Sequence, residues 1–259
     1  MIKISLFVLL AFLLTGCTSS RAASTVSTNS APALTVANTE SAPASAPAPD
    51  SAGSISGVVN FQGAVPKLPT LDMTGDPMCP QTPQPSEAVV VNNGKLENVF
   101  VYVKEGLPAG HIAPPSQPAV LDQQKCRYVP RVLGVMVGQP FEVTTHDQAI
   151  HNVHPMPSKN SQWNETQMPD DKPIVKKFTA PEMMIRMQCN QHPWMRAYVN
   201  VMTNPYFAVS KPDGSFEIKN LPPGEYTLAA VHEKFGEKTM KIKVAPQQTA
   251  KAAFDFSAK

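Results

Sequence analysis

A short run in the second half of the chain carries three side chains of the types that bind metal ions. Cys189, His192 and Met195 fall within the run C-x-x-H-P-W-M, which offers one thiol, one imidazole and one thioether. A second imidazole is available upstream, in a run that contains His151 and His154. Two histidines, one cysteine and a weakly bound methionine are the ligand set of a blue-copper electron-transfer site. Zinc more often takes four strong ligands, and methionine is a poor one.

The upstream run offers two histidines, but they should not both serve one ion. His151 and His154 are three residues apart, and residues with this spacing on a strand point to opposite faces. We therefore assign His151 as the ligand and keep His154 as the alternative. Of the four ligands, His192 is expected to lie nearest the surface and to act as the electron port. His146 and Asp147 are expected to be solvated turn residues.

The rest of the folded part must position these groups, and its pattern is that of short strands. Runs of β-branched and aromatic residues are bounded by glycine, proline and asparagine, which predicts an all-β fold built from β-sandwiches. Turn signals include Asn92-Asn93-Gly94 and Pro212-Asp213-Gly214. We expect at most one helical turn, within residues 155–171. The predicted strands cover residues 55–61, 87–91, 99–103, 132–137, 141–145, 174–178, 184–188, 198–202, 216–219, 226–232, 238–244 and 252–256.

Residues 118–203 resemble the cupredoxins. Their motifs follow the order of that family: an aromatic-proline start at Tyr128, a strand pair around Gly138, the run H-N-V-H, and then C-x-x-H-P-W-M. The last two motifs are most similar to those of the amicyanins. The resemblance implies a Greek-key β-sandwich with one type 1 copper ion, in which Asn152 pins the ligand loop through hydrogen bonds to backbone near Cys189. The copper ligands that it implies are His151, Cys189, His192 and Met195.

The end of the chain resembles a second family, the carboxypeptidase regulatory-like (transthyretin-like) β-sandwich. A D-G-x-F turn at Asp213 is followed by an L-P-P-G-x-Y hairpin that starts at Leu221. This match is too short for a complete sandwich, and residues 55–61 look like the missing opening strand. We therefore predict one small split sandwich with the copper module inserted into it. The alternative is two consecutive domains, with residues 54–107 in the copper module. The split organisation gives residues 54–117 and 204–259 to the small sandwich and residues 118–203 to the copper module.

The start of the chain predicts export and a lipid anchor. A basic start precedes an apolar run at residues 4–14, which suits a signal peptide and is too short to span a bilayer as a helix. Leu14-Thr15-Gly16-Cys17 looks like the lipobox of bacterial lipoproteins, in which residues 1–17 form the signal peptide and Cys17 is lipidated. Residues 18–53 are rich in serine, threonine, alanine and proline, which predicts a disordered linker. We expect a membrane-anchored lipoprotein that faces the periplasm or the cell surface.

Two further cysteines are expected to pair. An exported chain permits disulfides, and we predict that Cys79 and Cys126 form one that ties the copper module to the other sandwich. The competing possibility is a second metal site at these cysteines, which we disfavour because no histidine is near either of them in sequence. Cys189 then remains as the thiol available to a metal.

Together these features predict a lipid-tethered protein that holds one copper ion and carries single electrons. We expect a monomer whose redox partner docks near His192, and whose contact with the membrane is through the lipid anchor alone. The net charge of +2 gives no reason to expect nucleic acid as a partner. We expect no enzyme activity, because no acid/base pair or open metal position is recognisable. The alternatives are a copper chaperone or sensor, or a surface module that binds carbohydrate or a partner and has a vestigial metal loop.

Overall fold

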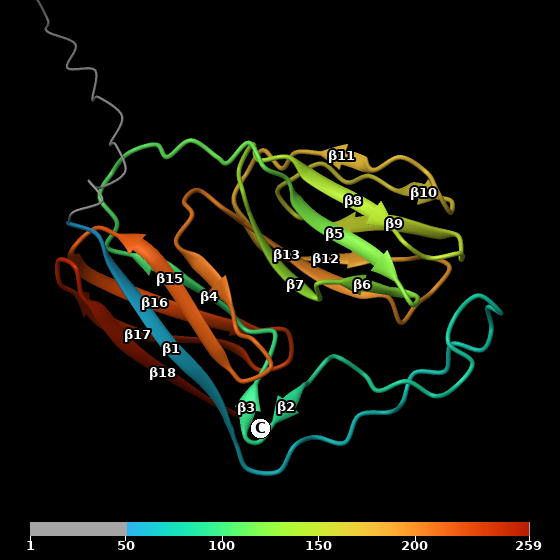
Figure 1. Ribbon diagram of the computed structural model, residues 1–259, viewed down its shortest axis with the longest axis horizontal. Helices are drawn as coiled ribbons and strands as arrows, with labels where there is room; N and C mark the ends of the chain where they lie inside the picture. Colours follow the sequence, from blue (N-terminus) through green and yellow to red (C-terminus); the bar gives the residue numbers. More distant parts are fainter. Residues whose placement is uncertain (1–50, 259) are drawn as a thin grey trace, which may run out of the picture. The chain divides into compact units, whose positions relative to one another are not determined.

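The computed structural model describes residues 51–258, and this part of the chain is all β (Figure 1). The predicted all-β fold with two β-sandwiches is confirmed. The signal peptide, Cys17 and almost all of the predicted linker lie outside the described residues. Between residues 51 and 258, the chain has no helix that is long and apolar enough to cross a membrane.

The first sandwich, here called the terminal sandwich, combines strands from both ends of the described chain. β1 pairs antiparallel with β15 and parallel with β18, so the earliest strand lies between two strands from the last part of the chain. Every second residue of β18 from Ala252 to Phe256 is buried, as expected for a strand with one face on a core. One sheet contains β1 (Gly53–Gln62), β2 (Val91–Asn92), β3 (Lys95–Leu96), β15 (Ser215–Leu221) and β18 (Thr249–Ser257), and the other contains β4 (Phe100–Glu105), β14 (Phe207–Val209), β16 (Gly224–His232) and β17 (Gly236–Val244).

The second sandwich, here called the central sandwich, consists of β5 to β13 and lies between β4 and β14 in sequence. Its core includes Tyr128, Phe141, Ile185 and Met187, all of them fully or almost fully buried. β13 pairs in parallel with β7, and β5 pairs in parallel with β8. One sheet contains β7 (Val132–Met136), β9 (His151–Met156), β10 (Glu165–Gln167), β12 (Glu182–Gln188) and β13 (Arg196–Met202), and the other contains β5 (Ala119–Gln124), β6 (Arg127–Val129), β8 (Phe141–Thr145) and β11 (Ile174–Lys176).

A long segment between β1 and β2, residues 63–90, packs on the central sandwich; we call it the strap. The strap has little regular structure, with one isolated bridge between Leu71 and Gln84. Its Met73 and Cys79 belong to the buried core of the central sandwich. The predicted disulfide between Cys79 and Cys126 is confirmed, and it fixes the strap to the turn between β5 and β6.

The turn at Gly214 shows why its residue type matters. Gly214 has a φ of 71°, a conformation that favours glycine. A Cβ at this position would lie 2.5 Å from the Val59 carbonyl oxygen, so the close approach of this turn to β1 also requires glycine. The predicted turn at residues 212–214 is therefore confirmed, with a packing reason for its glycine.

Some predicted elements differ from the structure. Only residue 91 of the predicted strand at residues 87–91 lies in a strand, because residues 87–89 form bends. The predicted turn at residues 92–94 is present and joins β2 to β3, two strands of two residues each. Residues 155–171 contain β10, which pairs with β9, and no helical turn. The strand β5 was not predicted, because polar side chains interrupt its apolar pattern; among them Gln123 is fully buried and donates a hydrogen bond to the Gln167 side chain.

Candidate metal centre

Two separate parts of the central sandwich bring three metal-binding side chains together. β9 begins at His151, and the loop after β12 carries Cys189 and His192. β9 and β12 are antiparallel neighbours, with Gln188 opposite His154, so the start of β9 lies beside the loop after β12. His151, Cys189 and His192 are all buried, and their donor atoms lie within 4.8 Å of one another.

The separations within this trio suit a single ion. The Nδ1 atoms of His151 and His192 lie 2.9 Å apart, and the Cys189 Sγ lies 3.7 Å from the His192 Nδ1. Two nitrogens that bind one ion at about 2.0 Å with tetrahedral angles lie about 3.3 Å apart. Met195, the fourth predicted ligand, is 99% buried near the end of the same loop, where its N–H donates to the His192 carbonyl oxygen.

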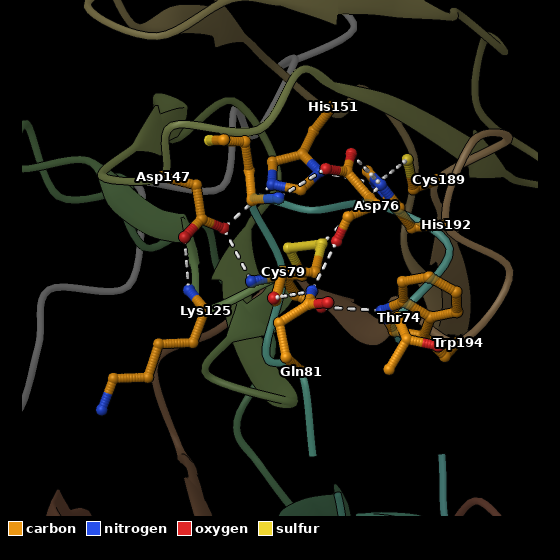
Figure 2. The surroundings of a disulfide bond; sticks show 12 residues. Thr74, Asp76, Cys79, Gln81, Lys125, Asp147, His151, Cys189, His192 and Trp194 are labelled. Carbon is orange, nitrogen blue, oxygen red and sulfur yellow. Dashed lines mark hydrogen bonds and ion pairs between the residues drawn. A yellow bond between two sulfur atoms is a disulfide. The ribbon is translucent and has the colours of Figure 1, made fainter. Parts of the chain in front are cut away.

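Each histidine of the trio has a carboxylate on its outer nitrogen. The Nε2 of His151 lies 2.9 Å from Asp147 Oδ2, and the Nε2 of His192 lies 3.1 Å from Asp76 Oδ2 (Figure 2). A carboxylate accepts the hydrogen, so each Nε2 carries the N–H, and the two Nδ1 atoms are directed toward each other. Two buried lone pairs at this distance repel unless a proton or a cation lies between them. The trio therefore fits a metal ion through its inner nitrogens.

The surroundings of the trio lower the pKa of its thiol and raise the pKa of one imidazole, so an ion that binds the inner nitrogen of His151 displaces a proton. Burial raises the pKa of Cys189, but hydrogen bonds from His151 and from the Asn152 N–H outweigh it, and the pKa falls below its usual value. Burial lowers the pKa of His151, but Asp147 and the Cys189 thiolate outweigh it and raise the pKa to about 9. Burial lowers the pKa of His192, and Asp76 only partly opposes this effect. A thiolate is the form of cysteine that binds metals.

Asn152 joins β9 to the ligand loop. Its Oδ1 accepts a hydrogen bond from the Asn190 N–H at 2.7 Å and one from the Cys189 thiol at 3.3 Å. Its own N–H points to the Cys189 Sγ at 3.5 Å. These contacts are of the kind that the sequence predicts for Asn152, and they hold the thiol beside the start of β9.

His154 lies outside the trio. It contacts the side chains of Asn190 and Gln162, and it is partly exposed on the other face of β9. Trp163 packs against the core of the central sandwich and stacks with Lys176. His146 is largely exposed and pairs with Asp122, as expected for a turn residue.

One expectation about the surroundings of the trio was wrong. Asp147 is not a solvated turn residue, because it accepts hydrogen bonds from the N–H groups of Lys125 and Cys126 as well as from His151. His192 is slightly more exposed than His151, but only 3% of it is accessible and its outer nitrogen faces the strap. In both cases a segment distant in sequence covers the trio.

The disulfide lies beside the two histidines, although the sequence suggested that no histidine was near it. The Cys79 Sγ is 3.9 Å from the His192 Nε2, and Figure 2 shows the disulfide beside both imidazoles. Two further groups of possible ligands meet here, Asp76 with Cys79 and His192, and Cys126 with Asp147 and His151. Neither group offers a thiolate, because both cysteines are in the disulfide. Cys189 is the free cysteine of the described chain.

Comparison with families and curated proteins gives one partial match. The family model of the beta-sandwich domain of ER membrane protein complex subunit 7 matches residues 188–255, which run from the end of β12 into β18. This match covers less than half of the chain. It names a different family from the carboxypeptidase regulatory-like one that the sequence motifs resemble, but the two agree on a β-sandwich. No curated protein matches the chain.

Several solved structures are similar to part of the chain. Amicyanin from Paracoccus versutus is 19% identical over 39% of this chain and 97% of its own, with a TM-score of 0.30. A purple cupredoxin from Nitrosopumilus maritimus is 19% identical over 32% of this chain and 99% of its own, with a TM-score of 0.28. The copper-containing nitrite reductase NirK from Thermus scotoductus SA-01 is 17% identical over 39% of this chain, with a TM-score of 0.32, and the match covers only 26% of NirK. These likenesses concern the fold alone.

Proposed function

We propose that this protein binds one type 1 copper ion and carries single electrons between redox partners. The observation that carries the proposal is the buried trio of His151, Cys189 and His192, whose inner nitrogens and sulfur face one another. Met195 is the proposed weak fourth ligand, on the basis of its place in the loop and its burial. Two histidines, a thiolate and a weak methionine form the ligand set that is diagnostic of blue copper.

The protein's part in this function is to hold the ligands still. Copper would supply a one-electron couple. Asp147 and Asp76 fix the imidazoles, and Asn152 fixes the ligand loop through the Asn190 N–H. Because these contacts come from strands and from a disulfide-bound segment, the donor positions should change little between the two oxidation states. A small rearrangement favours fast electron transfer.

A copper chaperone or sensor would use the same donors, but burial favours the carrier. Each member of the trio is at least 97% buried, and the strap lies over His192. A chaperone must pass its ion to a partner, which requires ligands that a partner can reach. A carrier can keep its ion enclosed, because the electron moves and the ion does not.

We place this carrier outside the cytoplasm, tethered by lipid on Cys17. The lipobox motif supports the anchor, and the disulfide between Cys79 and Cys126 supports an oxidising compartment. The redox partner is proposed to dock near His192. Because the strap covers this histidine, the partner would contact strap residues such as Met78, whose side chain is exposed.

Voltammetry of the copper-loaded protein, combined with a chelator challenge, tests the carrier. We expect one reversible one-electron wave and slow loss of copper to the chelator. A wave that disappears on cycling, together with rapid loss of copper, would instead indicate a chaperone. Cys189→Ser should abolish the wave, whereas the matched control His154→Gln should keep it, because His154 lies outside the trio.

A further inference from the structure

Two carboxylates hold the outer nitrogens of the two histidines, and they come from unrelated segments. Asp147 lies in the turn between β8 and β9, and its side chain is 11% exposed. Asp76 lies in the strap, and its side chain is 28% exposed. Neither residue belongs to the ligand motifs in the sequence. The two contacts nevertheless repeat the same arrangement, with a carboxylate oxygen on Nε2 and Nδ1 directed into the site (Figure 2).

Each of the two aspartates is hydrogen-bonded to the backbone at or next to one cysteine of the disulfide. Asp147 accepts hydrogen bonds from the N–H groups of Lys125 and Cys126, the latter at 2.8 Å. The Asp76 side chain accepts from the Met78 N–H at 2.8 Å, and its carbonyl oxygen accepts from the Cys79 N–H at 3.0 Å. The bond between Cys79 and Cys126 therefore joins the two segments that carry the carboxylates.

We propose that Asp76 and Asp147 are positioning residues that set the reduction potential of the copper, and that the disulfide keeps Asp76 in place. This inference rests on the proposed function. Hydrogen bonds of this type fix the orientation of a ligand histidine and increase its basicity, and their loss typically weakens metal binding about ten- to a hundredfold. The two aspartates would thus orient the ligand histidines without binding the ion, whereas the four proposed ligands bind it directly.

The negative charge of the two carboxylates determines whether they raise or lower the reduction potential. Together with the Cys189 thiolate, they place three negative charges around a divalent ion. Cu(II) carries more positive charge than Cu(I), so the carboxylates stabilise Cu(II) more and lower the reduction potential. Asp147 is the less exposed of the two, and water screens its charge less. Its neutralisation should therefore have the larger effect.

The test measures the reduction potential of copper-loaded variants of the full protein by spectroelectrochemistry. Asp76→Asn and Asp147→Asn keep a hydrogen-bond acceptor in place and remove the charge. We expect the potential to rise in both. In Asp76→Asn the ratio of Cu(II) to Cu(I) at a fixed applied potential should fall about tenfold, which for one electron is about 59 mV, and in Asp147→Asn it should fall further. Asp76→Glu should restore much of the lost Cu(II) preference.

The matched control is Asp72→Asn. Asp72 lies on the same strap and is exposed, and its carboxylate binds only Thr74 in the described structure. Its replacement should leave the potential unchanged. The double variant Cys79→Ser/Cys126→Ser should shift the potential in the same direction as Asp76→Asn, because the strap loses its anchor. Asp147 retains its backbone partners there.

The outcomes separate this inference from the proposed function. A blue band in every variant, with potentials equal to that of the wild type, would overturn the positioning role alone. Absence of the band from the wild-type protein would overturn the proposed function, and this inference with it. If Asp147→Asn does not fold, Asp76→Asn alone decides, because an unchanged potential in that variant contradicts the proposal.

Discussion

The Nδ1 atoms of His151 and His192 face each other at 2.9 Å in a buried space beside the Cys189 thiol. One histidine begins a strand and the other lies in a loop that follows a neighbouring strand. Their outer nitrogens are occupied by Asp147 and Asp76. The inner nitrogens are therefore the ones directed at the proposed ion, and the following predictions depend on this relationship or on the segments that enclose it.

Copper should stabilise the folded protein. An ion that binds only the native state adds about 4 kcal/mol to the free energy of unfolding when its free concentration is a thousand times Kd. Differential scanning calorimetry with and without copper measures this as a rise in Tm. Cys189→Ser should show little of the rise, and an equal rise in that variant would mean that copper binds elsewhere.

Loss of the disulfide should destabilise the protein. Cys79 and Cys126 are 47 residues apart, and a cross-link over such a loop is worth about 4 kcal/mol in the chain-entropy model. Urea unfolding of Cys79→Ser/Cys126→Ser should therefore show a lower free energy of unfolding than the wild type. A loss below about 1 kcal/mol would indicate that the strap is held by its packing, mainly through Met73, rather than by the disulfide.

Asn152→Ala should loosen the ligand loop. The substitution removes the acceptor of the partly buried Asn190 N–H, and its loss should cost about 1 kcal/mol, the low end of the range of about 1–3 kcal/mol for a buried donor without a partner. Asn190→Ala is the matched control, because it keeps the backbone N–H and changes only an exposed side chain. Chemical denaturation should rank Asn152→Ala well below Asn190→Ala in stability. Equal stability of the two would contradict a pinning role for Asn152.

Glu182 should make stability depend on acid pH. Burial raises the pKa of Glu182, but N–H and O–H donors of Ser158, Asn160 and Lys159 outweigh it and lower the pKa to about 2. Because the folded pKa is below the usual value of 4.5, this stabilisation is present above pH 4.5 and is lost as the pH falls toward 2. Glu182→Gln should flatten the dependence of the unfolding free energy on pH in this window. An unchanged slope would show that other carboxylates control it.

The local part of the site could be predicted from the sequence, because its residues are close together in the chain. The spacing C-x-x-H-P-W-M brings Cys189, His192 and Met195 into one loop. The two-residue period of a strand separates His151 from His154, and the structure places only His151 with Cys189 and His192. Strands near these residues could also be predicted where apolar side chains recur along the chain, as in β8 and β12.

The remainder could not be predicted, because it depends on contacts between distant segments. Asp76 reaches His192 from more than a hundred residues away, and no local pattern marks it as different from Asp72. Asp147 has the local pattern of an ordinary turn residue, because the Lys125 and Cys126 N–H groups that bind it belong to a separate turn. β5 could not be predicted for a related reason, since the side-chain amide of its buried Gln123 donates to Gln167 of β10, a residue distant in sequence.

A copper titration followed by visible absorption tests the central claim most directly. We predict an intense blue thiolate-to-copper band that saturates at one copper per chain, persists in His154→Gln and is lost in Cys189→Ser. A colourless complex would contradict a type 1 copper site built on His151, Cys189 and His192. An absorption band that still saturates at one copper per chain in Cys189→Ser would also contradict this site.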